Sequence, residues 1–358
     1  METTERTWLS LTGCCGSGPA NSRALPMRFL VIGCGSVGQR HIKNLMSLRA
    51  GDICAYDVLE DRREAVRSVL GIDTVDSLDE AWDWRPQGVL IATSTNMHVP
   101  LALQAVEQGC HLFVEKPLSR TLDGVDRLCA MAERHGSVTM VGCNMRFHPG
   151  PAAIKRLLEG KAIGRVIGAR IQTGSYLPRW RPWQDYRQSY SASPEWGGAI
   201  LDCIHEIDLA LWYLGPGSVL SAAHLPAQTI GLETDGLAEI LLEHESGTLS
   251  SVHLNFVQRD YRRTCQIIGS EGTIYWDFCD RRVRVHGPDG EIKDTYIEPE
   301  GWQLNQMYVD ELKHFVHAVK SGSQTINPLS GGVQALKVAL TARELGRRRG
   351  GPAIDGPE

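Results

Sequence analysis

Residues 28–41 read RFLVIGCGSVGQRH, which joins a short apolar run, three glycines and the start of an amphipathic helix. The run RFLVIG (28–33) predicts a strand, because parallel strands covered on both faces are almost continuously apolar. The glycines after it have the spacing that binds a dinucleotide pyrophosphate: they allow a tight turn, a close phosphate approach and close helix packing. The helix N-terminus then attracts the negative charge. The expected cofactor-binding residues here are Gly33, Gly35, Ser36, Val37 and Gly38.

Short apolar runs alternate with amphipathic stretches from residue 27 to about residue 147. Further strands are predicted at ICAYD (53–57), GVLIAT (88–93), HLFVE (111–115) and SVTMVG (137–142), with helices between them. Strands that alternate with helices predict a doubly wound parallel sheet with right-handed crossovers.

The pattern changes after Arg146, where a helix is followed by long strand-like runs in close succession. Val252, Leu254 and Phe256 alternate with polar residues, which is typical of a sheet with one face in solvent. A helix is expected over residues 198–214. This half of the chain predicts an α+β domain with a large, mostly antiparallel, open-faced sheet and helices on the other face.

The fold class is therefore α/β, in two domains. The expected parts are a flexible N-terminal extension (1–26), a cofactor-binding doubly wound domain (27–147), a substrate-binding and oligomerisation domain (148–350) and a flexible tail (351–358).

Composition excludes several kinds of partner. The chain has 358 residues, 42% of them hydrophobic, and a formal net charge of −5. It lacks the basic surface that nucleic acid or an anionic membrane face requires. No apolar run approaches the length of a bilayer span, and the ten cysteines show no metal-ligand spacing. We expect a cytoplasmic protein without a metal, nucleic-acid or membrane partner.

Asp57 ends the second predicted strand, where an acid accepts both ribose hydroxyls of NAD. A 2′-phosphate about 4 Å from this carboxylate would cost on the order of 4 kcal/mol at an effective dielectric near 20. NAD is therefore favoured over NADP, unless Arg62 or Arg63 neutralises the carboxylate. We count Arg62 among the cofactor-binding candidates, although a solvated helix face is the favoured explanation of both arginines.

Two more turns follow strands at the same sheet edge. After the third strand, Thr93, Asn96 and His98 can reach the cofactor, although Asn96 can instead cap the next helix. After the fourth, Lys116 points into the crevice where such sheets bind ligands, and Pro117 restricts the turn. Lys116 is thus a candidate for cofactor, substrate and catalytic roles.

The stretch EWGGAILDCIHEIDLALWYLG (195–215) opens with two glycines that permit close ligand approach and then becomes helical. Asp202 and His205, three residues apart, fall on one helix face, as does Asp208. A histidine beside a carboxylate can take a hydroxyl proton while hydride leaves the same carbon. The alternative is a salt-bridged surface histidine.

An aromatic stretch, residues 176–196, precedes that helix. Its rings with polar tips suit either sugar faces or a subunit interface. Tyr176, Trp183 and Tyr186 are the substrate-binding candidates from this stretch.

These motifs, in this order, resemble the Gfo/Idh/MocA family of NAD(P)-dependent oxidoreductases. The anchors are GCGSVGQRH, the strand-end acid, ATSTNMH, EKPLS, GCNMRFHP and the glycine–Asp–His helix. The resemblance implies a Rossmann domain and an open sheet that forms the interface of a homodimer or homotetramer. It implies a catalytic set matching Lys116, Asp202 and His205. It also places Glu115 and Asn144 beside the cofactor and Arg146 beside the substrate.

The sequence departs from the family pattern in two places. The usual helix spaces its Asp and His by four residues, so aligning on His205 would put Leu201 at the acid position. Trp196 replaces the first glycine of the usual triplet and narrows the expected pocket.

Together these features predict an NAD-dependent oxidoreductase acting on a secondary alcohol or ketone of a sugar, inositol or nucleotide-sugar derivative. His205 would take the hydroxyl proton, Lys116 would position the oxygen, and Asp202 would orient His205 or hold a neighbouring hydroxyl. The alternatives are a glycosidase that oxidises its substrate transiently with bound NAD, and a nucleotide-binding regulator without turnover.

Overall fold

The N-terminal half is a parallel, doubly wound domain, as predicted. The computed structural model describes residues 5–7 and 26–347, so most of the predicted extension and the tail lie outside the described residues. The sheet has the order β4-β3-β2-β5-β6-β7, with every neighbouring pair parallel. Its strands are β2 (Arg28–Ile32), β3 (Asp52–Tyr56), β4 (Asp73–Thr74), β5 (Gly88–Ile91), β6 (His111–Glu115) and β7 (Thr139–Gly142).

Helices cover both faces of this sheet, because its strands are apolar on both sides. They are α1 (Ser36–Ser47), α2 (Glu60–Leu70), α3 (Leu78–Asp83), α4 (His98–Glu107) and α5 (Val125–Arg134). Strand order reverses between β2 and β5, and the carboxyl ends of these two strands form the edge where ligands bind in such sheets.

The second domain is a large sheet of order β1-β15-β14-β13-β12-β8-β11-β10-β9, which is mostly antiparallel as predicted. Within the described strands of this sheet, only β8 with β11 and β1 with β15 run parallel. The strands are β8 (Val166–Tyr176), β9 (Gly217–Pro226), β10 (Asp235–His244), β11 (Leu249–Asn255), β12 (Val257–Gly269), β13 (Gly272–Asp277), β14 (Arg282–His286) and β15 (Ile292–Ile297). β1 (Glu5–Thr7) falls within the predicted extension and adds an edge strand.

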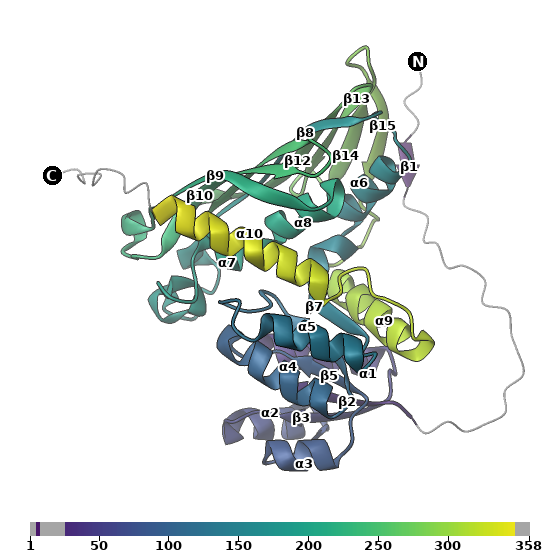
Figure 1. The fold of residues 1–358 in the computed structure, drawn as a ribbon, viewed down its shortest axis with the longest axis vertical. Coiled ribbons are helices and arrows are strands. Elements are labelled where there is room, and N and C mark those ends of the chain that lie inside the picture. The colour runs from purple at the N-terminus through teal and green to yellow at the C-terminus, as the bar shows by residue number, and fades with distance from the viewer. Residues whose placement is uncertain (1–4, 8–25, 348–358) are drawn as a thin grey trace, which may run out of the picture.

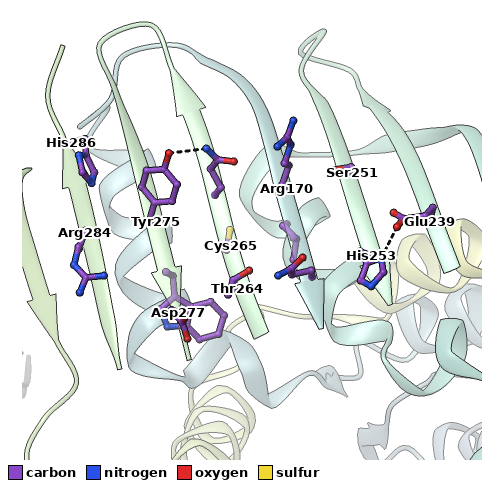
Figure 2. Close-up of a pocket in the computed structure, with 14 residues that line it drawn as sticks. Arg170, Glu239, Ser251, His253, Thr264, Cys265, Tyr275, Asp277, Arg284 and His286 are labelled. Atoms are coloured by element: carbon purple, nitrogen blue, oxygen red, sulfur yellow. Dashed lines mark hydrogen bonds and ion pairs between the residues drawn. The ribbon is translucent and has the colours of Figure 1, made fainter. Parts of the chain in front are cut away.

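Helices cover one face of the large sheet, and the other face is open (Figure 1). The covering helices are α6 (Pro149–Glu159), α7 (Ala199–Asp202), α8 (Ile204–Leu214) and α10 (Leu329–Arg347). This arrangement follows from the alternation of side chains along each strand: the apolar Ile171, Val252 and Ile267 point to the covered face and are buried beneath the helices. On the open face, polar side chains from six strands, β8 and β10 to β14, line a hollow of about 820 Å³ (Figure 2).

The last two helices tie the domains together. α9 (Asn305–Ser321) lies beside α1 on the parallel sheet, and its fully buried Phe315 meets Phe113 of β6 edge to face at 5.7 Å. α10 runs from β7 and α5 to β9 of the large sheet (Figure 1). Residues late in the chain therefore complete the core of the first domain.

The helix expected over residues 198–214 is broken. α7 ends at Asp202, Cys203 adopts φ −90° and ψ 31°, and α8 begins at Ile204. Asp202 and His205 therefore do not share one continuous helix face, and their relation is set by the break rather than by helical spacing.

Candidate active site

The glycine loop between β2 and α1 has the geometry of a phosphate cradle. A Cβ at Gly33, whose φ is +100°, would lie 2.6 Å from the Ala92 carbonyl oxygen, and one at Gly38 would lie 1.7 Å from the Gly33 carbonyl oxygen. A Cβ at Gly35, by contrast, would point into open space. The first and third glycines thus serve packing, while the second leaves room where a pyrophosphate approaches the backbone.

Ser36 and Val37 open helix α1, whose N-terminus has no side-chain cap and no acidic residue in its first turn. Its backbone N–H groups are therefore available to an anion. The loop and the helix end together fit a dinucleotide.

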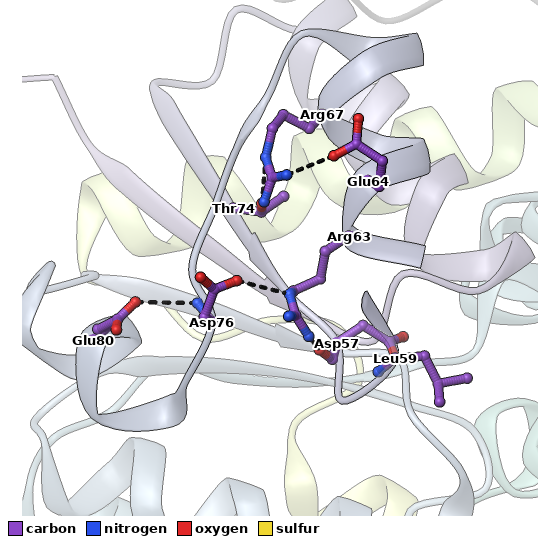
Figure 3. Close-up of polar contacts among 8 residues, drawn as sticks. All are labelled: Asp57, Leu59, Arg63, Glu64, Arg67, Thr74, Asp76 and Glu80. Atoms are coloured by element: carbon purple, nitrogen blue, oxygen red, sulfur yellow. Dashed lines mark hydrogen bonds and ion pairs between the residues drawn. The ribbon is translucent and has the colours of Figure 1, made fainter. Parts of the chain in front are cut away.

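Asp57 lies directly after β3 and is buried. Its carboxylate accepts the backbone N–H of Cys34 at 2.7 Å and that of Leu59 at 2.9 Å. An ionised carboxylate has about four acceptor positions, so the two backbone N–H groups leave it able to accept from a ribose. The half-exposed Arg62 guanidinium lies 3.5 Å from the carboxylate, whereas Arg63 bridges the Asp57 carbonyl and Asp76 (Figure 3).

His98 joins the two loops at the sheet edge. Its buried ring lies 3.0 Å from the Pro117 carbonyl oxygen and 3.2 Å from that of Thr93. Burial lowers the pKa of His98, so the ring is neutral. Both ring nitrogens face protein groups, and His98 shapes the edge rather than reaching the cleft, unlike the partly exposed Thr93 and Asn96.

Lys116 and Asp202 meet across the cleft. The Lys116 ammonium donates to Asp202 Oδ1 at 3.0 Å and to the Asp202 carbonyl oxygen at 2.8 Å. Burial alone would lower the pKa of Lys116, but the Asp202 carboxylate raises it above its usual range, so the side chain stays a cation. The neighbouring Glu115 is held by His41 at 2.6 Å and also accepts the Lys116 backbone N–H.

His205 lies close to this pair. Burial, with the positive charges of Lys116 and Arg263, holds the pKa of His205 well below its usual range. Its Nδ1 is enclosed and has no hydrogen-bond partner within the described residues. Asp202 makes no hydrogen bond to it among residues 26–347, so the structure couples Asp202 to Lys116, not to His205. Leu201, the other position considered for the acid, is fully buried.

A buried ion pair lies behind His205. Glu206 of α8 has no exposed surface, and its Oε1 lies 2.7 Å from Arg263 Nε of β12. Burial raises the pKa of Glu206, and the same carboxylate raises that of Arg263. Sequence reasoning missed this pair because its members are far apart in the chain.

Tyr190 and Ser191 are further site residues that the sequence did not single out. They form a 3₁₀ turn (Tyr190–Ala192), and Ser191 Oγ donates to Asp202 Oδ2 at 2.5 Å. The Tyr190 hydroxyl is enclosed near Lys116, and Thr95 lies beside it without hydrogen-bond geometry. The sequence signal that could have identified Tyr190 and Ser191 is their position shortly before Gly197 and Gly198.

Gly197 and Gly198 have a different role from the one expected. A Cβ at Gly197 would lie 2.4 Å from the Tyr190 carbonyl oxygen, and one at Gly198 would lie 2.2 Å from Asp235 Oδ1. The glycines therefore let the Tyr190–Ser191 turn and Asp235 pack against the start of α7, where Asp235 accepts the Ile200 N–H at 2.9 Å. They serve close packing of the protein on itself.

Arg146 is not placed in the cleft, contrary to the expectation. Its guanidinium is buried in a two-point ion pair with Asp208, at 2.9 and 2.7 Å, and donates to the Ile326 carbonyl oxygen. The same pairing turns Asp208 away from the site. Asn144, two residues earlier, is also buried.

The aromatic candidates make separate contacts with different parts of the second domain and its surroundings. Tyr186 donates to the Ile230 carbonyl oxygen at 2.9 Å, Trp183 is 80% exposed, and Trp196 packs against Arg120. The Tyr176 ring contacts Arg179 and Arg259. Tyr176, Trp183 and Tyr186 make no hydrogen bond to Lys116 or Asp202 within residues 26–347, in contrast to Ser191 of the same stretch.

No group of three or more His, Cys, Asp or Glu side chains in the described part of the chain is placed to hold a metal ion. Nor does any helix within residues 26–347 combine the length and apolar character needed to cross a bilayer.

Comparison with known proteins agrees with this architecture. Residues 27–143 match the family described as "Oxidoreductase family, NAD-binding Rossmann fold", and residues 152–275 match the "GFO/IDH/MocA C-terminal domain". The chain is 28% identical over 333 residues to myo-inositol 2-dehydrogenase of Thermotoga maritima, covering 89% of this chain and 96% of that protein. It is also 28% identical to the NAD(+)-dependent scyllo-inositol 2-dehydrogenase of Bacillus subtilis, covering 84% and 88% of the two chains.

Solved structures share the fold. Levoglucosan dehydrogenase, in complex with NADH and levoglucosan, superposes with a TM-score of 0.80 at 20% identity, covering 90% of this chain and 97% of that one. The two family matches, the cradle for a dinucleotide and the two-domain architecture lead to one conclusion. The chain belongs to the Gfo/Idh/MocA family of NAD-binding oxidoreductases.

Proposed function

We propose that the chain is an NAD-dependent dehydrogenase or reductase that transfers hydride between nicotinamide and a secondary alcohol or ketone of a sugar, an inositol or a related derivative. The observation that carries this proposal is the Lys116 ammonium held 3.0 Å from Asp202, with the neutral His205 beside it, at the carboxyl edge of the parallel sheet. A cation and a neutral base in one cleft are the two groups that alcohol oxidation needs.

The cofactor would be held by the glycine loop, the N-terminus of α1 and Asp57, with Thr93 and Asn96 at the neighbouring edge. Bound NAD supplies the acceptor for hydride in oxidation, and NADH the donor in reduction. Asp57 favours NAD over NADP, because its buried carboxylate would face the 2′-phosphate of NADP.

Side chains of the protein would supply proton transfer and charge stabilisation in this reaction. His205 takes the proton of the substrate hydroxyl, for which its lowered pKa leaves it unprotonated at neutral pH. Lys116 holds the same oxygen and stabilises the negative charge that grows on it. Asp202 keeps the Lys116 ammonium in place instead of orienting His205, and Ser191 fixes the second oxygen of Asp202.

The substrate class is inferred from the activities for which the relatives are named. Inositol dehydrogenases are the relatives at 28% identity, and levoglucosan dehydrogenase shares the fold. Ring hydroxyls of a polyol fit a cleft with a fixed ammonium, a carboxylate and aromatic rings at its rim.

We also infer that a second copy of the chain docks on the open face of the large sheet. The hollow there carries both signs of charge, Arg170 and Arg284 with Glu239 and Asp277, as a self-complementary two-fold interface requires (Figure 2). Light scattering after gel filtration should give a dimer or tetramer mass, and Tyr275→Arg at the centre of this face should lower that mass. A monomeric wild-type protein would contradict the inference.

The experiment that tests the proposed reaction is a screen of NAD reduction over inositols, aldoses and nucleotide sugars, with NADP in parallel. Net NADH formation with a free polyol supports the proposal. Hydrolysis of an aryl glycoside without net NADH would assign a glycosidase that oxidises its substrate transiently. NAD binding without turnover of any compound, in either direction, would assign a regulator.

A further inference from the structure

Arg343 of α10 holds the segment of chain that leads to Asp202. α10 packs against α7 and β9 (Figure 1). The Arg343 side chain is buried, its Nε lies 3.3 Å from Asp235 Oδ1, and its Nη2 donates to the Pro194 carbonyl oxygen at 3.0 Å. One cation therefore joins a buried carboxylate to the backbone of the loop before α7.

Asp235, the first residue of β10, holds the start of α7 with its other oxygen. Its Oδ2 accepts the Ile200 N–H at 2.9 Å, in the first turn of the helix, where N–H groups have no partner inside the helix. A Cβ at Gly198 would lie 2.2 Å from Asp235 Oδ1, so only glycine lets the carboxylate come this close. Asp235 therefore fixes the start of α7 against the large sheet.

Residues 190–202 form two arms, and the buried ion pair holds both. The first arm ends at Pro194, whose carbonyl oxygen Arg343 holds. The second arm is α7 with the glycines before it, and Asp235 holds its first turn. Because Arg343 and Asp235 also contact each other, the two arms are fastened to one point, and we call this pair of residues the clamp.

The two arms meet again at the reacting pair. Ser191 of the first arm donates to Asp202 Oδ2 at 2.5 Å, and Asp202 of the second arm holds the Lys116 ammonium at 3.0 Å. The Gly198 N–H donates to the Ser191 carbonyl oxygen at 3.1 Å, which joins the arms between these contacts and the clamp. The position of the Asp202 carboxylate therefore depends on how the arms are held together.

We propose that Arg343 and Asp235 are positioning residues for the proposed reaction: through the two arms they hold the Asp202 carboxylate where it fixes the Lys116 ammonium. Within residues 26–347 neither side chain hydrogen-bonds to Lys116, so both act through Asp202. The planar guanidinium has donors in a rigid fork, and its hydrogen bonds set the direction of the groups that accept them. This inference rests on the proposed function, because it assigns a role within that reaction.

Kinetics in two backgrounds test the proposal. Arg343→Gln removes the charge and the fork, and we expect kcat to fall about three- to tenfold with KM little changed, because Lys116 is held less firmly. In an Asp202→Asn background the same substitution should change kcat less than about twofold, because the carboxylate through which the clamp acts is already gone. A merely structural role would give the same loss in both backgrounds. That result, or no loss in the wild-type background, would overturn the proposal.

Further variants separate positioning from a general loss of folding. Asp235→Asn keeps an oxygen for the Ile200 N–H and should lose less activity than Asp235→Ala, which removes both contacts. Arg281→Gln is the matched control, because Arg281 also pairs with a carboxylate, Glu298 at 2.7 Å, and donates to a backbone carbonyl, that of Pro299. It lies beside β14 and β15, near the other end of the large sheet, and its loss should leave kcat unchanged. A fall in kcat as large as that of the clamp variants would contradict the assignment.

Chemical labelling of Lys116 gives a readout that does not depend on turnover. Acetylation by N-hydroxysuccinimidyl acetate, followed by peptide mass spectrometry, requires the neutral amine, which the Asp202 carboxylate disfavours. We expect Lys116 to react at least about threefold faster in Arg343→Gln than in the wild-type protein or Arg281→Gln, with no further gain when Arg343→Gln is added to Asp202→Asn. This pattern supports the clamp even if no compound in the NAD screen is oxidised, in which case the proposed reaction fails alone. Unchanged labelling of Lys116 in Arg343→Gln overturns the clamp and leaves the proposed reaction intact.

Discussion

Lys116 Nζ and Asp202 Oδ1 lie 3.0 Å apart, although 86 residues separate them in the chain and each belongs to a different domain. Lys116 follows the last residue of β6 in the parallel sheet, and Asp202 ends the short helix α7 over the large sheet. The Lys116 side chain is 22% exposed and the Asp202 side chain 13% exposed, so the ion pair is largely shielded from solvent but still accessible to a ligand. The pair joins the two domains at the point where our proposal places the reacting oxygen.

Replacement of Lys116 by Met removes the cation and keeps most of the side-chain volume. We expect kcat for alcohol oxidation to fall roughly 10²- to 10³-fold, because the negative charge on the substrate oxygen loses its partner. NAD affinity, measured by fluorescence quenching, should change little, since the glycine loop and Asp57 are untouched. If Lys116→Met turned over at a rate close to that of the wild-type protein, Lys116 would have no catalytic role, and the likeness to the family would extend only to the fold.

Ser191→Ala tests the second contact of Asp202. Without the hydroxyl, Oδ2 loses its only side-chain donor among the described residues and the carboxylate can rotate away from Lys116. We expect kcat to fall about tenfold with KM little changed, since a hydrogen bond to a charged group contributes about 1.5 to 3 kcal/mol.

Two companion variants make the Ser191 result specific. Ser191→Thr keeps the hydroxyl and should recover much of the activity. Ser189→Ala removes a neighbouring hydroxyl that bonds the Tyr186 carbonyl oxygen at 2.6 Å, and it should leave kcat unchanged. An equal loss in Ser189→Ala and Ser191→Ala would point to a general disturbance of the loop instead.

Two glycine variants in this loop should separate NAD affinity from fold stability, because one should affect mainly the affinity and the other mainly the stability. Gly35→Ala adds a methyl group in open space, so thermal stability should hold while Kd for NAD rises at least about tenfold, equivalent to ~1.4 kcal/mol. Gly38→Ala would place a Cβ 1.7 Å from the Gly33 carbonyl oxygen, and it should destabilise the fold by roughly 1 to 3 kcal/mol. Thermal melting and calorimetry with NAD measure both effects. An unchanged Kd in Gly35→Ala would contradict the phosphate position.

Asp57→Asn removes the charge and keeps a side-chain oxygen for the Cys34 N–H. The discrimination against NADP should fall by a factor on the order of 10², because the repulsion of the 2′-phosphate disappears and Arg62, 3.5 Å away, becomes free to approach it. The ratio of kcat/KM for NAD and NADP measures this change. If the wild-type protein already prefers NADP, Asp57 does not face the ribose as expected.

Much of the fold could be predicted from sequence because its signals are local. The glycine spacing, the apolar parallel strands and the alternation of Val252, Leu254 and Phe256 each depend on neighbouring residues, and the structure confirms the sheets that they predict. The break at Cys203 was not predicted, because the residues on both sides of it favour helix and no local sequence signal marks it.

The site was predicted less completely, for the same reason. Lys116, Asp202 and His205 were predicted through motifs, and the structure places Lys116 against Asp202 with His205 near them. Arg146 was assigned to substrate from its motif, but sequence cannot show that Asp208 takes its guanidinium. The Ser191 contact and the Arg263–Glu206 pair join residues far apart in the chain, so no spacing pattern marks them.

The role of His205 as the base is tested most directly by the pH dependence of kcat/KM for NADH formation, in the wild-type protein and in His205→Ala. Because burial, Lys116 and Arg263 lower the pKa of His205, the neutral base persists as pH falls, and activity should be lost only well below pH 6.5. In His205→Ala, kcat should fall roughly 10²- to 10⁴-fold and that acid limb should disappear. Unchanged turnover in His205→Ala, or the same acid limb in both proteins, would contradict the account.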